Sequence, residues 1–384
     1  MRVKLKDIFD LQMGKTPSRS NLEYWNTTDY KWISIADLTK TSKYIFETKE
    51  YLSKSAIKDS GIKVIPANTV VMSFKLSIGK TAITKEDMYS NEAIMAFKDK
   101  HVINIIPEYI FYLFKYKNWE ECSNKAVMGK TLNKATLSEI EVEICSIEKQ
   151  RQIVNILDKI MSAVDGRKQE LQLLDELIKA RFVEVFGDIN INDKNWECEF
   201  LGNLCTIVRG GSPRPIEKFL GGDVPWIKIG DATEADNIYL SSTKEHIIKE
   251  GVKNSRLVKE GSLIFANCGV SLDFARIITF DGCIHDGWLA MEDIDKRLDK
   301  VFLLQALNQM TEHFRAIAPA GTQPNLNTAI MKAYKQVIPP IELQKEFIRF
   351  VHQVNKSKFD TMTFAPIYDI INLYLHTHFY QGRR

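Results

Sequence analysis

Apolar residues recur at alternating spacings of four and three along residues 147–186, a segment without proline. The seam positions are Ile153, Leu157, Ile160, Val164, Leu171, Leu174 and Ile178. This spacing places one apolar seam on an α-helix and is typical of a coiled coil, although a solvated amphipathic helix has a related pattern. At about 1.5 Å per residue, the segment predicts a helix of roughly 60 Å.

A second apolar series begins at residue 341 and would give the first helix its partner. Its seam positions are Phe347, Phe350, Val354 and Ile371. Pro366 lies inside this series. A proline removes one backbone hydrogen bond of a helix and clashes with the preceding turn. We therefore expect a kink or break near Ala365.

The segments 1–145 and 191–340 have a different pattern, in which short β-branched runs alternate with Gly, Pro and Asn. Runs such as Thr69–Met72 and Ser262–Phe265 predict strands separated by turns. Short helical stretches interrupt them, for example residues 107–117. Each segment therefore predicts a mixed α/β domain. The expected order along the chain is domain, long helix, domain, long helix.

The two halves of the chain repeat each other at a nearly constant offset of 192 to 196 residues, which indicates an internal duplication. The halves are not identical, since Asn91 is matched by His285 and Lys80 roughly by Arg276. The matched pairs are Gly14–Pro17 with Gly210–Pro213, Trp32–Asp37 with Trp226–Asp231, Thr69–Met72 with Ser262–Phe265, Ser90–Ala93 with Ile284–Gly287, Gly129–Asn133 with Gly321–Asn325, and Ile147–Gln150 with Ile341–Gln344.

Composition adds few constraints. The 384 residues carry a net charge of +3, and 45% of them are hydrophobic, as in a soluble globular protein. No window approaches the roughly 18 apolar residues of a membrane span, and the N-terminus has no secretory signal. Six cysteines without a CxxC pair fit reduced thiols, so we expect a cytoplasmic protein without a zinc site.

The motifs in the sequence do not indicate a catalytic site. Gly-Lys-Thr occurs at residues 14, 79 and 129, but a phosphate-binding P-loop needs a further glycine where Phe9, Phe74 and Asn124 stand. Such triplets suit a phosphate oxygen of nucleic acid, or they are ordinary solvated turns. The sequence has no GxSxG or HExxH motif, and it lacks the Asn/Asp-Pro-Pro-Tyr/Phe tetrapeptide of amino-methyltransferases. We expect no cofactor and no metal.

Several of these motifs resemble the specificity subunit of Type I restriction–modification systems. The resemblance rests on Val337–Lys345, Ile144–Arg151 and Phe186–Asp188, together with the duplicated Gly-x-Thr/Ser-Pro and Trp-Ile-x-Ile-x-Asp motifs. It covers essentially the whole chain in the family's order. It implies an α+β fold with two target recognition domains, at 1–146 and 191–340, and two antiparallel spacer helices, at 147–190 and 341–384.

The resemblance also implies a function. Each recognition domain would read one half of a bipartite target in double-stranded DNA, and the helices would set the spacing of the half-sites. The subunit would be non-enzymatic. It would recruit two modification subunits, which methylate adenine N6 with S-adenosylmethionine, and restriction subunits, which cleave DNA using ATP.

Candidate DNA contacts lie in loops of both domains, since Arg reads guanine and Asn or Gln reads adenine. The first domain has 22 basic and 18 acidic residues and the second has 17 and 19, so the second must bind DNA through a local patch. We expect Trp32 and Trp226 to be core residues. The candidates are Lys15, Thr16, Arg19, Lys75, Lys80, Asn91, Lys130 and Asn133 in the first domain, and Arg209, Ser212, Arg214, Asn267, Arg276, Gln323 and Asn325 in the second.

Three alternatives stay open from the sequence. The chain could belong to a related methylation-only or Type II-like system. It could be the recognition half of a nuclease–methyltransferase, in which case it would bind S-adenosylmethionine. It could also be a coiled-coil scaffold with two protein-binding domains, which its near-neutral charge allows.

Overall fold

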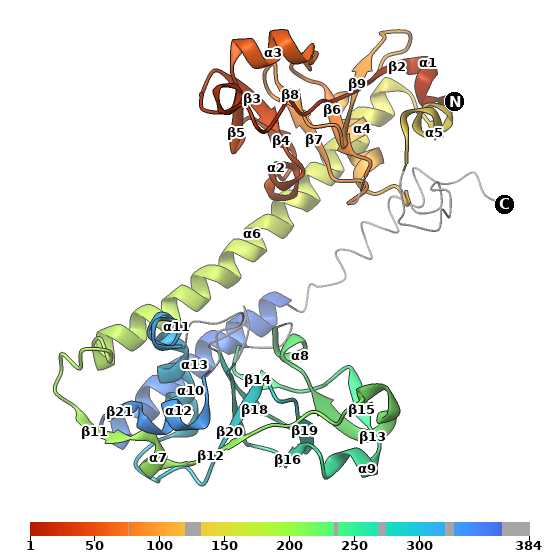
Figure 1. Ribbon diagram of the computed structural model, residues 1–384. Coiled ribbons are helices and arrows are strands. Elements are labelled where there is room, and N and C mark those ends of the chain that lie inside the picture. Colours follow the sequence, from red (N-terminus) through yellow and green to blue (C-terminus); the bar gives the residue numbers. More distant parts are fainter. Residues whose placement is uncertain (76, 120–131, 234–236, 268–273, 319–325, 363–384) are drawn as a thin grey trace. The chain divides into compact units, whose positions relative to one another are not determined.

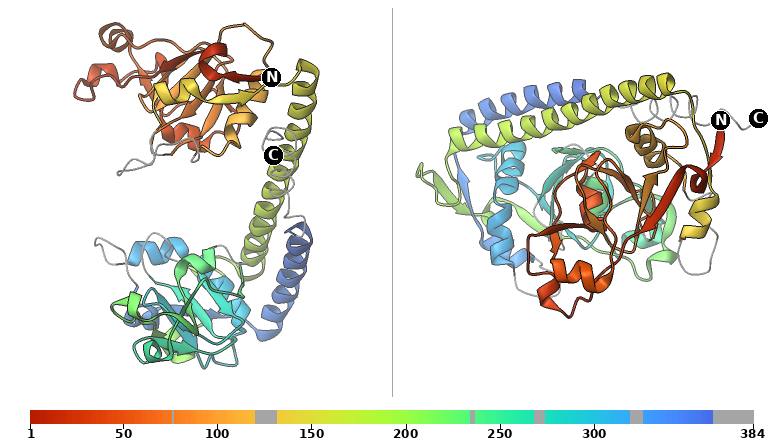
Figure 2. Two further views of the ribbon diagram at one scale, coloured as in Figure 1. Left: turned by 90° about the vertical axis from the view of Figure 1, so that its right-hand side faces the viewer. Right: turned by 90° about the horizontal axis from the view of Figure 1, so that it is seen from above.

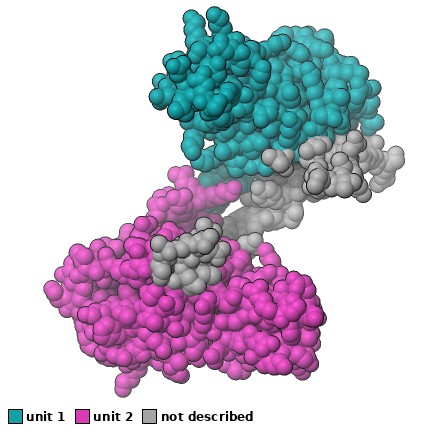
Figure 3. All heavy atoms as spheres, in the orientation of Figure 1, with its two compact units in different colours: residues 1–167, 364–384 teal, residues 168–363 magenta. Residues whose placement is uncertain are grey.

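The computed structural model describes residues 1–75, 77–119, 132–233, 237–267, 274–318 and 326–362. The described residues form two compact units, 1–167 and 168–362 (Figure 3). One helix, α6 (Ile147–Phe186), is shared by both, because its first part belongs to unit 1 and the rest to unit 2 (Figure 1). It covers the range in which the heptad pattern predicts a helix.

Unit 1 contains the first domain, which is built on a mixed five-stranded sheet of order β2-β9-β6-β7-β4, in which only β4 and β7 run parallel. A smaller sheet of order β5-β3-β8 and the antiparallel pair β1-β10 complete it. The strands are β1 Arg2–Lys4, β2 Phe9–Met13, β3 Tyr30–Ile33, β4 Tyr44–Ile45, β5 Glu50–Leu52, β6 Val70–Ser73, β7 Thr81–Thr84, β8 Tyr89–Ser90, β9 Ile94–Asp99 and β10 Glu141–Glu143. The helices are α1 Leu5–Ile8, η1 Leu22–Tyr24, α2 Ile35–Lys40, α3 Lys54–Ser60, α4 Pro107–Lys115 and α5 Lys134–Glu139.

The second domain repeats this topology in unit 2. Its five-stranded sheet has the order β12-β20-β17-β18-β14, and its smaller sheet, β15-β13-β19-β16, gains one strand. The strands are β11 Glu197–Phe200, β12 Thr206–Arg209, β13 Leu220–Ile227, β14 Tyr239–Leu240, β15 Glu245–Ile247, β16 Arg256–Val258, β17 Leu263–Ala266, β18 Ala275–Ile278, β19 Gly282–Ile284, β20 Trp288–Glu292 and β21 Lys335–Ile338. The helices are α7 Leu201–Leu204, η3 Ile216–Lys218, α8 Ile229–Thr233, α9 Lys249–Val252, α10 Lys300–Gln309, α11 Thr311–Ile317, α12 Thr328–Ala333 and α13 Ile341–Met362. The predicted duplication and mixed α/β domains are therefore confirmed.

The structure corrects the register of two sequence matches. Asn133 caps the N-terminus of α5, and the residue that caps the matching helix α12 is Asn327 rather than Asn325. Arg276 lies opposite Ile264 in the sheet, where Ala82 lies opposite Val71 in the first domain. The counterpart of Arg276 is therefore Ala82, and not Lys80.

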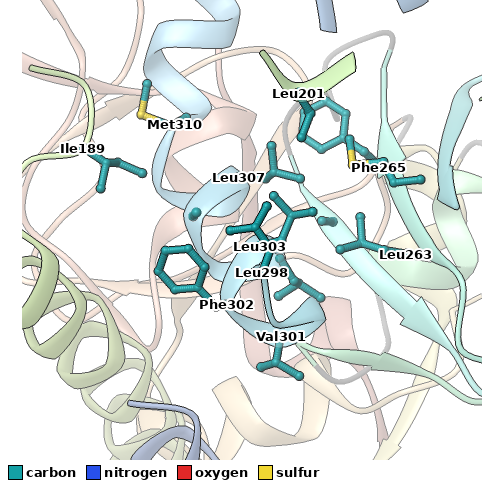
Figure 4. Close-up of a cluster of buried hydrophobic side chains, with 14 of the residues drawn as sticks. Ile189, Leu201, Leu263, Phe265, Leu298, Val301, Phe302, Leu303, Leu307 and Met310 are labelled. Atoms are coloured by element: carbon teal, nitrogen blue, oxygen red, sulfur yellow. The ribbon is translucent and has the colours of Figure 1, made fainter. Parts of the chain in front are cut away.

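A largely buried helix packs between each sheet and the long helix. In the first domain this is α4, whose residues from Tyr109 to Phe114 are all buried beneath β6, β7 and α6. In the second domain it is α10, buried from Val301 to Leu307 (Figure 4). Both helices are apolar around most of their circumference, as expected for an element covered on two sides.

The second half of α6 packs antiparallel against α13 (Figure 2). Phe186 and Phe182 lie 5.3 and 5.5 Å from Phe347 between ring centroids, whereas Arg181 stacks on Phe350, further along α13. The sequence pattern includes Ile178, Phe347 and Val354 of this contact and misses Phe182, Phe186 and Val351.

The first half of α6 uses its seam differently. Ile153 and Leu157 are buried in the core of the first domain, and Ile160 packs at its edge, rather than against α13. Val164 and Leu171 are half-buried, and Leu174 packs at the edge of the second core. Ile371 and the break expected near Ala365 lie outside the described residues.

Candidate nucleic-acid interface

The Gly-x-Thr-Pro loop of the first domain follows β2 and is held against the turn between β8 and β9. The N–H of Gly14 donates to the carbonyl of Ile94 (3.1 Å), and the N–H of Lys15 donates to that of Ser90 (2.8 Å). A Cβ atom on Gly14 would lie 2.2 Å from the carbonyl oxygen of Asn91, so this approach requires glycine. In addition, the N–H of Asn91 donates to the carbonyl of Ile33 (3.1 Å).

The second domain repeats these bonds in its Gly-Gly-Ser-Pro loop. Gly210 donates to the carbonyl of Trp288 (2.9 Å) and Gly211 to that of Ile284 (3.0 Å). A Cβ atom on Gly210 would lie 2.1 Å from the carbonyl oxygen of His285. The N–H of His285 donates to the carbonyl of Ile227 (3.1 Å). We call these two loop-and-turn pairs clamp 1 (residues 14–19 with 90–92) and clamp 2 (residues 209–214 with 284–286).

In each clamp a hydroxyl group also binds an acid. The Thr16 hydroxyl donates to the Glu92 carboxylate, and this bond lowers the pKa of Glu92 below its usual value. The Ser212 hydroxyl donates to Asp286 Oδ1 at 2.8 Å. Thr16 and Ser212 are therefore candidate contacts whose hydroxyl hydrogens already have partners. Neither acid was among the residues expected at the site.

One or two arginines lie beside each clamp. The Arg19 guanidinium lies 3.7 Å from the Trp25 ring centroid and donates to Glu50. In clamp 2, Arg209 Nε donates to the Asp286 carbonyl at 3.1 Å, and Arg214 Nη2 lies 3.7 Å from Asp286 Oδ2. These guanidinium groups keep exposed N–H donors, since all three residues are exposed.

The ring of His285 occupies the position of Asn91 in clamp 2. Its Nδ1 accepts the N–H of Gly287 (2.9 Å), and its Nε2 lies 2.9 Å from Asp286 Oδ1. Burial lowers the pKa of His285, against the opposing effect of Asp286. The lowered pKa favours the neutral ring, and the acceptor role of Nδ1 favours the tautomer with its proton on Nε2.

The other candidates of the first domain lie outside the residues of clamp 1, although the charge of Lys75 helps to lower the pKa of Glu92 in that clamp. Lys80 Nζ donates to Thr39 Oγ1 at 2.5 Å, and Lys75 Nζ lies 5.3 Å from the Phe74 ring centroid. The Asn133 side chain accepts the Thr136 N–H as a helix cap. The Gly-Lys-Thr triplets were expected to offer backbone N–H groups, but those of Gly14, Lys15, Gly79 and Lys80 all donate within the domain.

Two candidates of the second domain are buried, contrary to the expectation of a loop contact. Asn267 is fully buried, and its Nδ2 donates to the Leu326 carbonyl at 3.0 Å. Arg276 is 7% exposed, and its guanidinium lies 4.7 Å from the Phe274 ring centroid. Both stabilise the interior of the domain. Lys130, Gln323 and Asn325 lie outside the described residues.

The Trp-Ile-x-Ile-x-Asp motif supports the clamps from beneath. Trp32 and Trp226 are buried, as expected, and Trp32 Nε1 donates to the Lys15 carbonyl at 3.1 Å. Asp37 accepts the N–H groups of Ser34 and Lys49. Asp231 accepts those of Lys228 and Lys244 in the same way. The two aspartates therefore hold the local backbone in place, and the clamp loops are the parts of each domain that could contact a ligand.

Comparison with known proteins decides the family. A family model described as the Type I restriction modification DNA specificity domain matches residues 1–176 and again residues 193–366. The chain belongs to this family. It is a DNA-recognition subunit of a Type I restriction–modification system, with one copy of the specificity domain in each half.

Individual relatives of this specificity subunit agree with that assignment. The MjaIX specificity subunit of Methanocaldococcus jannaschii is 25% identical over 90% of this chain and 84% of its own length. The EcoR124I/EcoR124II specificity subunit of Escherichia coli is 25% identical over 42% of this chain and 41% of its own.

Solved structures share the fold of the specificity subunit. The S subunit from M. genitalium has a TM-score of 0.52 at 13% identity and covers 99% of this chain and 96% of its own. A chain from a structural study of Type I complex assembly and conformational transition has a TM-score of 0.59 at 15% identity. The match covers 98% of this chain and 97% of that chain.

Within the described residues, no group of three or more His, Cys, Asp or Glu side chains is placed to hold a metal ion. None of the helices in this part of the chain combines the length and the apolar character needed to cross a membrane.

Proposed function

We propose that each domain of this specificity subunit reads one half of a bipartite DNA target, and that the two clamps carry the reading residues. The observation that carries the proposal is the duplicated clamp, which repeats its backbone hydrogen bonds and its hydroxyl–acid bond in both domains. This set of hydrogen bonds, the frame of the clamp, is the same in both domains, but the side chains that it presents differ. A shared frame with different side chains suits two readers of different half-sites.

Charge supports a local footprint in the second domain. That domain has a net charge of −2, from 17 basic and 19 acidic residues, so it cannot rely on a general attraction to DNA. Arg209 and Arg214 supply exposed cations beside His285. Asp286 restrains both arginines and would reduce the entropy lost when they bind a base edge.

Replacing Arg214 with alanine should change the sequence read by the second domain only. A bidentate Arg–guanine contact contributes about 1–3 kcal/mol of discrimination, so the half-site preference should fall by roughly tenfold to 100-fold. The measurement is the set of methylated adenines produced by the reconstituted modification complex. Arg214→Lys, which keeps the charge but loses the bidentate geometry, should lose the same preference.

Arg19→Ala is the matched control in clamp 1, and it should alter the other half-site. An equal loss of methylation at all sequences after Arg214→Ala would make Arg214 a phosphate contact and would contradict the proposed base reading.

The catalytic activities reside in partners. We propose that the subunit assembles with two modification subunits, which methylate adenine N6, and with restriction subunits. Because this complex acts on cellular DNA, we expect it in the cytoplasm. Support for a partner surface comes from α6, on which Leu173 and Leu177 are 54% and 46% exposed and lie one helical turn apart. Adjacent exposed leucines suit a docked helix of another subunit.

The double substitution Leu173→Glu and Leu177→Glu should weaken binding of the modification subunit by at least about tenfold, because two charges would enter an apolar contact. Co-purification and titration with the modification subunit measure this effect. Lys168→Gln, an exposed change on the opposite side of the same helix, should leave binding unchanged. Unaltered complex formation by the double variant would exclude this face of α6.

A further inference from the structure

An aspartate on α6 ties the first domain to the long helix. Asp158 Oδ1 accepts a hydrogen bond from Lys43 Nζ at 2.5 Å and another from the Tyr112 hydroxyl. Lys43 directly precedes β4, the edge strand of the five-stranded sheet, and Tyr112 lies on α4. Three elements therefore meet at one carboxylate. We call this group anchor 1 (Lys43, Tyr112, Asp158).

A second aspartate on the same helix does the same for the second domain. Asp175 Oδ1 accepts a hydrogen bond from Asn237 Nδ2 at 2.5 Å and binds the ammonium group of Lys358. Asn237 lies just before β14, the edge strand that corresponds to β4. Lys358 lies on α13 and is only 9% exposed. We call this group anchor 2 (Asp175, Asn237, Lys358).

The anchors are not a simple product of the internal duplication. At the repeat offset of 194, the residue of α13 that corresponds to Asp158 is His352, which is exposed. Both carboxylates instead lie on α6, the continuous helix that the two units share. Each domain is thus bonded to the same helix through a polar residue that lies just before its edge strand.

The expected contribution of such contacts to folding is small. Asp158 and Asp175 are each about two-fifths exposed, and partly exposed ion pairs typically add little stability. A charge-assisted hydrogen bond is directional, however, and it resists rotation of the groups that it joins. The attachment points therefore restrain orientation more than they stabilise the fold.

We propose that Asp158 and Asp175 are positioning residues which hold each recognition domain at a fixed orientation on α6, and so limit the spacer length that the subunit accepts between half-sites. The inference rests on the proposed reading of a bipartite target. A reader that can tilt on its helix reaches half-sites at more than one distance, whereas a fixed reader accepts one spacing.

The test uses the full complex with its modification subunits and DNA duplexes that keep both half-sites. The spacer between them is native, one base pair shorter or one base pair longer. Asp158→Ala and Asp175→Ala should each raise methylation of the altered spacers by about tenfold relative to the native spacer, the scale of one relieved mismatch. Half-site sequences should not change. Asp165→Ala, an exposed carboxylate on the same helix, is the matched control.

Asn237→Ala is the milder variant, because it removes the bond from the second domain and keeps the Asp175–Lys358 pair. Asn237→Ala should also raise the spacer ratio, which is the methylation of the altered spacers relative to that of the native spacer. A thermal melting curve checks that this variant is folded. An unchanged spacer ratio in the folded Asn237→Ala and Asp158→Ala variants would overturn the inference. Failure of the proposed function looks different, because wild-type methylation would then not depend on both half-sites.

Discussion

Replacing Phe182 with alanine is expected to lower the free energy of unfolding by about 3–5 kcal/mol, the range found for buried aromatic residues. Phe182 is fully enclosed on α6 and packs against three other aromatic rings (4.9–5.8 Å between centroids), those of Phe186, Phe302 and Phe347. These rings come from α6, α10 and α13. Alanine would leave a cavity where the shared helix, the buried helix of the second domain and α13 meet.

Chemical denaturation of the purified chain measures this loss. The matched control is Val183→Ala, the next residue on α6, whose side chain is about half exposed. It should cost less than about 0.5 kcal/mol, as is usual for surface positions. A cost for Phe182→Ala no larger than that of the control would mean that this aromatic cluster does not hold unit 2 together.

Removing the side chain of Gln344 is expected to cost about 3 kcal/mol. Gln344 is fully buried in the first turn of α13. Its Oε1 accepts the Asp299 N–H (2.8 Å), and its Nε2 donates to the carbonyls of Arg297 (2.8 Å) and Pro339 (2.7 Å). Gln344→Ala would leave these backbone groups without their partner, at about 1–3 kcal/mol for each group that water cannot reach.

The duplication supplies a replicate of this experiment. Gln150 in the first turn of α6 accepts the Ile106 N–H (2.9 Å) and donates to the carbonyls of Asn104 and Cys145 (3.0 Å each). Gln150→Ala should therefore destabilise unit 1 by a similar amount. Gln353→Ala, exposed on α13, is the control and should be neutral within about 0.5 kcal/mol. Losses below about 1 kcal/mol at both buried glutamines would show that water replaces the lost bonds.

The matching glutamines illustrate what sequence comparison within one chain can detect. Ile147–Gln150 and Ile341–Gln344 align because the same hydrogen bonds are needed twice. The motif pairs around Gly14 and Gly210 align for the same reason. Where the backbone geometry tolerates few residue types, the same residues occur in both halves of the sequence. The sequence therefore predicts the repeat, the long helix and the supporting frame of the clamps.

The helix contacts were harder to predict because a heptad pattern assumes a coiled coil. From Ile178 the buried positions continue at Phe182 and Phe186, with steps of four rather than alternating three and four. A straight helix of 3.6 residues per turn drifts relative to a seven-residue repeat. The first half of α6 also packs against its own domain, which spacing alone cannot reveal.

Residue type was a poor guide to burial at the site. Asn267 and Arg276 have side chains that suit DNA, but one bonds to the Leu326 backbone and the other covers Phe274. Conversely, Glu92 and Asp286 carry the wrong charge for DNA and lie at the centre of the clamps. Only their contacts identify them as parts of the frame.

The close approach at Gly14 and Gly210 divides each clamp into positions that can vary and positions that cannot. A side chain at either glycine would overlap a backbone carbonyl, so no library of variants should randomise them. Gly211 must also stay glycine, because a Cβ atom there would lie 2.8 Å from the backbone oxygen of Asn254. Randomisation belongs instead at the presented positions, Lys15, Arg19 and Asn91 in clamp 1 and Arg214 and His285 in clamp 2. Because the two frames are separate, a new half-site can be selected in one domain while the other keeps its original target.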